Sequence, residues 1–272
     1  MTQQFLLFSA ENAALKNALW SLDTTSHSNQ IDSTELFPSN FVGYGGAVYF
    51  DGFTRIGSGG RFGLWVTDGS SAHEITGIAN TPAGGLDPGN PIIFNNLMYF
   101  EGFDTAGHVG LWVSDGIAAD THEIVPANAF SGGIFSNAFP YFTVYNGSLY
   151  FAGRDAGNHT VLWTSGGTAA TTNVVPVPGL EQPFGLVSFN RSLYFDGIDP
   201  SGHFNLWQSD GTAAGTHELI VADASSSFGL VPRDLTPYAS PTLGTTGLYF
   251  NGLNADVRQV LFATDGDRGR HA

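Results

Sequence analysis

Short apolar segments recur along the chain and alternate with turns rich in glycine, asparagine and aspartate. Typical examples are Leu149-Tyr150-Phe151 and Leu162-Trp163, in which aromatic and branched side chains dominate. Such runs, bounded by turn residues, are typical of β-strands. The segment 11–19 has a helical composition, but no repeat carries a helical period, and its position matches a hairpin turn in the other repeats. The pattern therefore predicts an all-β protein.

The apolar segments belong to tandem repeats, and each repeat contains a Leu-Trp or Leu-Phe pair. The aromatic residues of these pairs are Trp20, Trp65, Trp112, Trp163, Trp207 and Phe262, and in four copies an Asp-Gly pair begins three residues later. A second motif, usually Leu-Tyr-Phe or Met-Tyr-Phe, precedes each pair. The spacing of 44 to 55 residues between successive aromatics matches one four-stranded propeller blade better than one helical hairpin.

Each repeat reads as four strands, A to D, with two-residue turns such as Asn95-Asn96 between A and B. We therefore predict a six-bladed β-propeller that forms one domain over residues 1–272. The predicted blades are 1–34, 35–80, 81–128, 129–178, 179–223 and 224–272. The first blade lacks strand A and the last lacks strand D, so residues 1–4 and 267–272 supply improvised strands, or the chain pairs with another copy or is part of a longer array.

The segment LWQSDGTAAGTHEL at 206–219 resembles a bacterial tandem-repeat family written ELWxxDGTxxGT. The resemblance covers six copies, although the glutamate of the family motif is replaced, for example by Gly63 and Gly110, and Gly166 stands in place of the aspartate in the fourth copy. The resemblance implies a propeller-forming protein of the bacterial surface or exterior. It implies no particular chemistry.

Charge and composition exclude several classes of protein. The chain has 9 basic and 24 acidic residues, a formal net charge of −15, and one lysine, so we expect no nucleic-acid partner. It has no cysteine, which excludes disulfides and thiolate chemistry. No apolar stretch is long enough for a membrane span and the N-terminus lacks the pattern of a Sec signal peptide. We expect an extracellular or cell-surface location reached by another route, or otherwise a cytoplasmic one.

Motifs for known catalytic and metal chemistry are missing from the sequence. His-Glu pairs at 73–74, 122–123 and 217–218 have no second histidine at zincin spacing and fall in predicted strands. No nucleophile elbow, phosphate-binding loop or EF-hand is present. We predict no cofactor and no metal site, and leave calcium at the Asp-Gly turns as an open alternative.

One position in every repeat carries a basic or imidazole side chain, four residues before the Trp or Phe. These candidate ligand-binding residues are Lys16, Arg61, His108, His159, His203 and Arg258. In five repeats an Asp or Asn stands four residues earlier, as in Asp199 before His203. One interpretation is structural, with the Asp or Asn capping the turn and pairing with the cation. The other is a ring of cations on one rim that attracts an anion.

Aromatic residues offer two further places for ligand binding. The Trp and Tyr residues of strands B and C are expected mainly in the core. A second interpretation is sugar stacking by Tyr49, Tyr99, Tyr150, Tyr194 and Tyr249, with hydrogen bonds from the neighbouring Asp51, Glu101, Asp196 and Asn251. The aromatic-rich connections between strands D and A differ between repeats and are where repeat scaffolds usually carry function.

From the sequence we expect a non-enzymatic, lectin-like or adhesive binding module for a glycan or another anionic surface ligand. The alternative is a lyase or hydrolase with an axial pocket lined by His and Asp from several blades. A purely structural role, through homo-oligomerisation of incomplete blades, is a third possibility.

Overall fold

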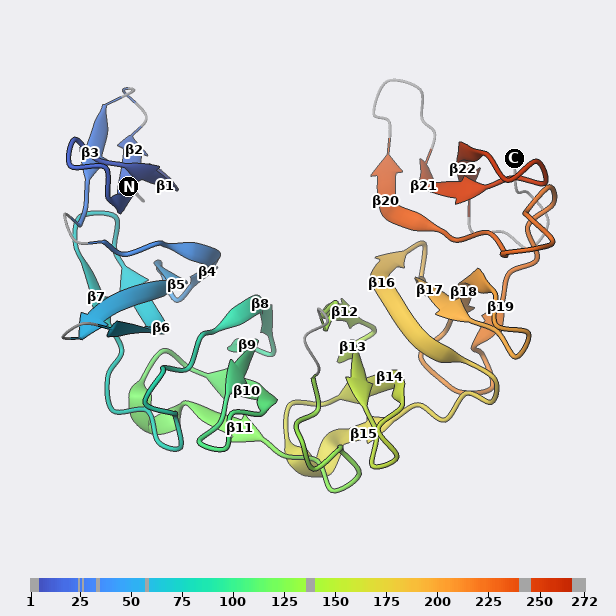
Figure 1. Ribbon diagram of the computed structural model, residues 1–272, viewed down its shortest axis with the longest axis horizontal. Helices are drawn as coiled ribbons and strands as arrows, with labels where there is room; N and C mark the ends of the chain where they lie inside the picture. Colours follow the sequence, from blue (N-terminus) through green and yellow to red (C-terminus); the bar gives the residue numbers. More distant parts are fainter. Residues whose placement is uncertain are drawn as a thin grey trace. The chain divides into compact units, whose positions relative to one another are not determined.

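The computed structural model describes residues 5–23, 25, 27–32, 35–56, 59–135, 140–239 and 246–265. The protein is all-β, with 57% strand and two short 3-10 helices in the described part. Its strands form six small antiparallel sheets (Figure 1). Two compact units, Met1–Val125 and Pro126–Ala272, contain three sheets each.

The first unit contains one three-stranded and two four-stranded sheets, each ordered as in the sequence. The strands of the first sheet are β1 (Phe5–Glu11), β2 (Asn17–Asp23) and β3 (Ser28–Gln30). The second sheet contains β4 (Ser39–Tyr44), β5 (Ala47–Ile56), β6 (Gly59–Thr67) and β7 (Ala72–Glu74). The third sheet contains β8 (Gly89–Phe94), β9 (Leu97–Phe103), β10 (Val109–Ser114) and β11 (His122–Ile124), with the helix η1 (Ala118–Asp120) before β11.

The second unit contains two four-stranded sheets and a three-stranded one. The fourth sheet of the chain contains β12 (Thr143–Tyr145), β13 (Ser148–Arg154), β14 (Thr160–Ser165) and β15 (Thr172–Val174), with η2 (Ala169–Thr171) before β15. The fifth contains β16 (Glu181–Phe189), β17 (Ser192–Ile198), β18 (Phe204–Ser209) and β19 (His217–Glu218). The sixth contains β20 (Arg233–Ala239), β21 (Thr246–Leu253) and β22 (Gln259–Thr264).

Four of the six sheets have the four strands predicted for each repeat. Segment 11–19 forms the end of β1, a turn and the start of β2, not a helix. The first sheet has no strand A in the described residues, as expected. Residues 1–4 and 267–272, which were predicted to supply improvised strands, lie outside the described residues.

The A–B turns need residues that tolerate positive φ, which is why Asn and Gly recur there. Both turn residues have positive φ in four sheets, for example Asn95 at 48° and Asn96 at 56°, as a tight type I′ hairpin requires. Each such turn brings an aromatic of strand A against the tyrosine of strand B, as with Phe94 and Tyr99, whose ring centroids are 5.6 Å apart. The turn and the aromatic pair together fix the register of strands A and B.

The Trp or Phe of strand C faces the Phe of strand B in all six sheets. Phe100 lies opposite Trp112 and Phe195 opposite Trp207, and both members of the first pair are fully buried. In five of the sheets a glycine stands two residues after the Phe and leaves room for the aromatic ring of strand C. A Cβ on Gly102 would lie 3.0 Å from Trp112 Cδ1 and 2.8 Å from Leu86 Cδ1.

A buried leucine in several D–A connections joins one sheet to the next through its backbone. Leu36 N donates to Asn17 O at 2.9 Å, and Leu36 O accepts from Phe53 N at 2.6 Å. Leu86 and Leu230 likewise accept from strand B of the following sheet, at 2.8 and 2.7 Å. All three side chains are at most 2% exposed. These connections therefore link neighbouring sheets within a unit by hydrogen bonds, a role that the sequence did not predict.

A buried hydroxyl pair closes the C–D turn in three sheets. The Oγ atoms of Ser209 and Thr216 lie 2.6 Å apart, and Ser209 Oγ also accepts from Gly211 N at 2.9 Å. Thr216 in turn donates to Thr212 O at 2.6 Å. Equivalent pairs are Ser114 with Thr121 and Ser165 with Thr172. The Ser-Asp-Gly and Thr positions of the repeat are thus explained by turn geometry.

Candidate functional site

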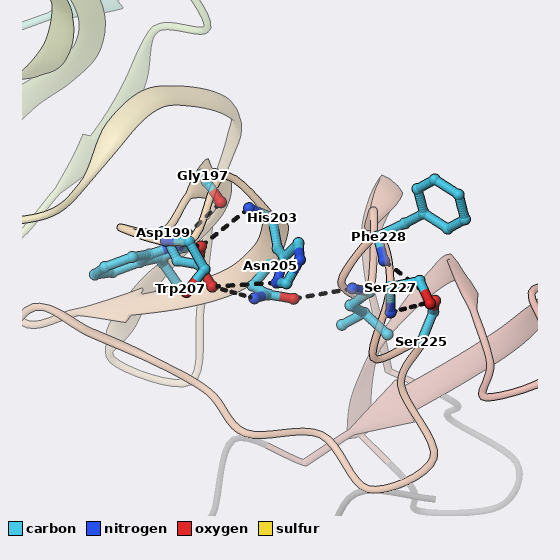
Figure 2. Close-up of polar contacts among 10 residues, drawn as sticks. Gly197, Asp199, His203, Asn205, Trp207, Ser225, Ser227 and Phe228 are labelled. Atoms are coloured by element: carbon cyan, nitrogen blue, oxygen red, sulfur yellow. Dashed lines mark hydrogen bonds and ion pairs between the residues drawn. The ribbon is translucent and has the colours of Figure 1, made fainter.

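The Asp or Asn of the predicted rim motif caps its own B–C turn. Asp199 Oδ1 accepts hydrogen bonds from Ser201 N at 2.8 Å and His203 N at 3.0 Å (Figure 2). The same pair of backbone bonds is made by Asn12, Asp104, Asp155 and Asn254. The prediction that the Asp or Asn caps its turn is therefore confirmed in these five turns.

The three rim histidines lie beside the carboxylates of their own turns. The distances from Nδ1 to the nearest carboxylate oxygen are 3.4 Å for His108, 3.5 Å for His159 and 3.9 Å for His203. Asp199 is also tied to Asn205 Nδ2 at 3.2 Å, and Asn205 Oδ1 accepts from Leu230 N at 2.9 Å. Figure 2 shows this chain of contacts reaching toward the connection that carries Ser225 and Phe228. The turn therefore helps to hold the next sheet.

The remaining rim cations differ from one another. Arg61 is paired with a carboxylate from strand D, since its Nε and Nη2 lie 3.0 and 2.9 Å from Glu74 Oε1. Lys16 and Arg258 are exposed and make no ion pair with any carboxylate of the described residues. A role of the rim in ligand binding stays a prediction, and four of its six cations already have an acidic partner.

A different polar feature recurs where strand A bulges. One residue of strand A, or just before it, has positive φ in five sheets: Asn40 (53°), Asn90 (50°), Tyr141 (51°), Gln182 (48°) and Asp234 (57°). Four of these strands show register shifts at that point. Bulges and left-handed non-glycine residues cluster at functional sites in proteins.

Opposite each bulge, strand B carries a residue that is acidic in three of the five sheets. Asp51 and Asp196 are 5% and 3% exposed, and in each the Oδ1 atom is buried without a hydrogen-bond partner. Burial raises the pKa of Asp51 to about 8, helped by the nearby charge of Asp87. Burial raises the pKa of Asp196 to about 7, against the opposing effect of Arg233. Burial also raises the pKa of Glu101, which accepts a hydrogen bond from Asn90 Nδ2 at 2.6 Å.

In the second unit one of these buried carboxyls opens onto a pocket of about 350 Å³. Three sheets of the unit contribute to it, through β13, β14, β16, β17, β18 and β20 and the segment before β12. Its polar and ionisable lining residues are Tyr141, Arg154, Thr160, Gln182, Asp196 and Arg233, and its aromatic residues also include Phe135, Phe184 and Phe204. This volume is within the range of pockets that hold small ligands. We call it the second-unit pocket.

The second-unit pocket combines an aromatic surface with hydrogen-bonding groups. The rings of Tyr141 and Phe184 lie with centroids 4.3 Å apart, and Phe184 is 41% exposed. Gln182 stands at the bulge of β16, and Asp196 lies opposite Phe184 in the register. An aromatic face with nearby carboxyl, amide and guanidinium groups can stack on an apolar ring face and bond its hydroxyls.

Sequence reasoning identified part of this site. Asp196 was named beside Tyr194 as a sugar-binding candidate, and the aromatic D–A connections were named as a functional region. Tyr194 itself is fully buried, as is Tyr99, so neither ring presents a face to a ligand. Gln182, Arg154 and Arg233 were missed, because no motif precedes a bulge and only the tertiary structure brings their strands together. None of the six rim cations lines the pocket.

No group of three or more His, Asp or Glu side chains in the described part of the chain is arranged to hold a metal ion. Calcium at the Asp-Gly turns stays a prediction. None of the helices in the described ranges has the length and apolarity needed to cross a membrane.

Comparisons with known proteins report on the fold. No family model and no curated protein matches the sequence. Among solved structures, a prolyl endopeptidase is similar with a TM-score of 0.58 and 11% identity, over 94% of this chain and 39% of that one. The acylaminoacyl peptidase of Pyrococcus horikoshii is similar with a TM-score of 0.52 and 11% identity, over 97% and 42%. TolB from Acinetobacter baumannii, a β-propeller, has a lower TM-score of 0.45 at 11% identity, over 97% and 64%.

The chain thus spans less than half the length of the two peptidases it resembles. At this level of identity the likeness shows a shared fold and nothing about activity.

Proposed function

We propose that the six sheets are the blades of one six-bladed β-propeller, and that the protein is a non-enzymatic, lectin-like binding module whose glycan site is the second-unit pocket. The repeated A-to-D meander and the six Phe–aromatic pairs between strands B and C support the propeller. Resemblance to the ELWxxDGTxxGT repeats is consistent with this arrangement and with an extracellular or cell-surface location.

The observation that carries the binding function is the combination of groups in the pocket. Phe184 and Tyr141 offer apolar ring area, and Asp196 Oδ1 is a buried oxygen without a described partner. Gln182, Asp196 and Arg233 add amide, carboxyl and guanidinium groups to the lining of the same pocket. Sugars present an apolar ring face and a rim of hydroxyls, and both needs are met here.

A glycan array followed by titration calorimetry tests this proposal. Phe184→Ala is expected to weaken binding of the array hits about tenfold, because an aromatic contact contributes about 0.5–1.5 kcal/mol beyond its buried area. Phe41→Ala is the matched control, because Phe41 is also on a strand A and is 36% exposed but belongs to the first unit. Equal losses in the two variants, or no hit on the array, would contradict the assignment.

The rim cations provide a second, separable place for an anionic ligand. The set is Lys16, Arg61, His108, His159, His203 and Arg258. If it binds the glycan, changing His108, His159 and His203 to Ala weakens binding. If it is only turn structure, these changes leave binding intact and lower stability.

One observation favours the enzymatic alternative, a lyase or hydrolase. A carboxyl whose pKa is raised to about 7 by burial, as for Asp196, is suited to give and take protons near neutral pH. The test is turnover of the array hits. If the protein forms product and the Asp196→Asn variant does not, the protein is an enzyme and the proposal of a non-enzymatic binding module is wrong.

A further inference from the structure

Positive charge in the second-unit pocket is not balanced by neighbouring carboxylates. Arg154 Nη2 lies 2.8–2.9 Å from the carbonyl oxygens of Gly132, Gly133 and Phe135, and its guanidinium lies 4.7 Å from the ring centroid of Phe130. It forms no ion pair within the described part of the chain, and its Nε is buried without an acceptor. This charge is built into the wall of the pocket.

Arg233 supplies a second guanidinium from β20. Its side chain is exposed and lines the pocket together with Asp196 and Tyr141, and its charge opposes the rise that burial causes in the pKa of both. It has no ion pair with a described carboxylate. The adjacent acid, Asp234, accepts a hydrogen bond from Asn251 Nδ2 at 3.2 Å. The Arg233 guanidinium is therefore available to a ligand.

The one acidic residue in the lining does not neutralise these two cations. Asp196 is largely protonated below neutral pH, because its pKa is raised to about 7 by burial. The lining then carries two positive charges and no negative one, within a chain of net charge −15. A cationic pocket in an acidic protein concentrates anions at that place.

We propose that the ligand of the second-unit pocket is an acidic sugar, whose carboxylate pairs with Arg233 while its ring packs against Tyr141 and Phe184. A planar guanidinium with paired donors matches a carboxylate in a way that a lysine does not. In its neutral form the Asp196 carboxyl can donate a hydrogen bond to the same ligand. The inference rests on the proposed glycan-binding function and specifies its ligand class.

Matched trisaccharide pairs test the inference by calorimetry at pH 6. Each pair has the same linkage and either neutral residues or the corresponding uronates, in the glucose, galactose and mannose series. At least one uronate is expected to bind tenfold or more tightly than its neutral counterpart. Arg233→Gln is expected to remove this preference, whereas Arg191→Gln, a change at an exposed arginine outside the pocket lining, leaves it unchanged.

The outcomes separate the inference from the proposed function. Neutral sugars that bind as tightly as uronates, with no effect of Arg233→Gln, overturn the acidic ligand and leave glycan binding standing. If no saccharide binds either on the array or in calorimetry, the proposed function itself is overturned. A sulfated trisaccharide that binds as tightly as the uronate overturns carboxylate selectivity in favour of a general anion site.

A pH series adds a second readout. Ionisation of Asp196 between pH 6 and 8 places a negative charge near the ligand carboxylate, so uronate binding is expected to weaken severalfold. The other ionisable groups of the lining are Tyr141, Arg154 and Arg233, while Phe184 and Leu206, opposite Asp196 in the sheet, are uncharged. Asp196→Asn is expected to flatten this profile, and a slope that survives in the variant would contradict the role of Asp196.

Discussion

Asp51 makes the stability of the protein depend on pH in a direction opposite to that of a carboxylate whose pKa is lowered on folding. It is 5% exposed in β5, with Oδ1 unpartnered and only a 3.3 Å contact from Ser39 Oγ to Oδ2. Burial raises its pKa from 3.8 to about 8. The folded chain therefore holds this proton more tightly than the unfolded chain does.

The consequence for stability follows from proton linkage. Below pH 4 Asp51 is protonated in both states and has no effect. Between pH 4 and 8 the unfolded carboxyl is ionised and the folded one is not, so stability falls by about 1.4 kcal/mol per pH unit. Over this interval the loss from Asp51 amounts to about 5 kcal/mol, comparable with the whole stability of a small domain. Above pH 8 the effect is constant.

The substitution Asp51→Asn tests this, with the free energy of unfolding measured by urea denaturation at pH 5, 6, 7 and 8. The amide does not ionise. We therefore expect the free energy of unfolding of the variant, relative to that of the parent chain, to rise by about 1.4 kcal/mol for each unit of increasing pH. A constant cost of about 1–3 kcal/mol is expected for the amide donor that replaces Oδ1. Asp223→Asn, at an exposed position, is the control and should follow the parent chain. Parallel curves for Asp51→Asn and the parent chain would refute the reasoning.

Four further substitutions test the fold at single positions, each by denaturant unfolding. Val257 holds the left-handed position of its B–C turn with φ of 59°, where Gly202 stands in the fifth sheet with φ of 85°. We expect Val257→Gly to stabilise by about 0.5–1 kcal/mol and Gly202→Val to destabilise by about 1–2 kcal/mol, and a shift of the same sign in both would contradict the turn assignment. Gly102→Ala is expected to destabilise by about 1–3 kcal/mol, because the new methyl meets the Trp112 indole, and a neutral result would show that the indole can move. Leu230→Ala should cost about 2–5 kcal/mol, because the Leu230 side chain is buried in the core between the fifth and sixth sheets, and a cost below 1 kcal/mol would contradict this packing.

The repeat pattern was sufficient to predict the local structure. Residues that tolerate positive φ, such as Asn95 and Asn96, predicted the hairpin turns, and the spacing of Leu-Trp and Tyr-Phe predicted which strands pair. The Asp–His turns were also predicted, because a capping aspartate acts on backbone atoms only two and four residues away. These features depend on short-range geometry, which sequence spacing encodes directly.

The candidate site was decided by the tertiary structure. Gln182, Asp196 and Arg233 come from three strands of two sheets, and only the bulges and the packing of neighbouring sheets bring them into one pocket. The raised pKa of Asp196 is likewise a result of burial, which a sequence pattern of alternating residues does not measure. The sequence by itself determined the strands, their turns and their order, because these are set by contacts within one repeat. Which side chains meet between repeats, and with what charge, depends on long-range packing and was decided only by the tertiary structure.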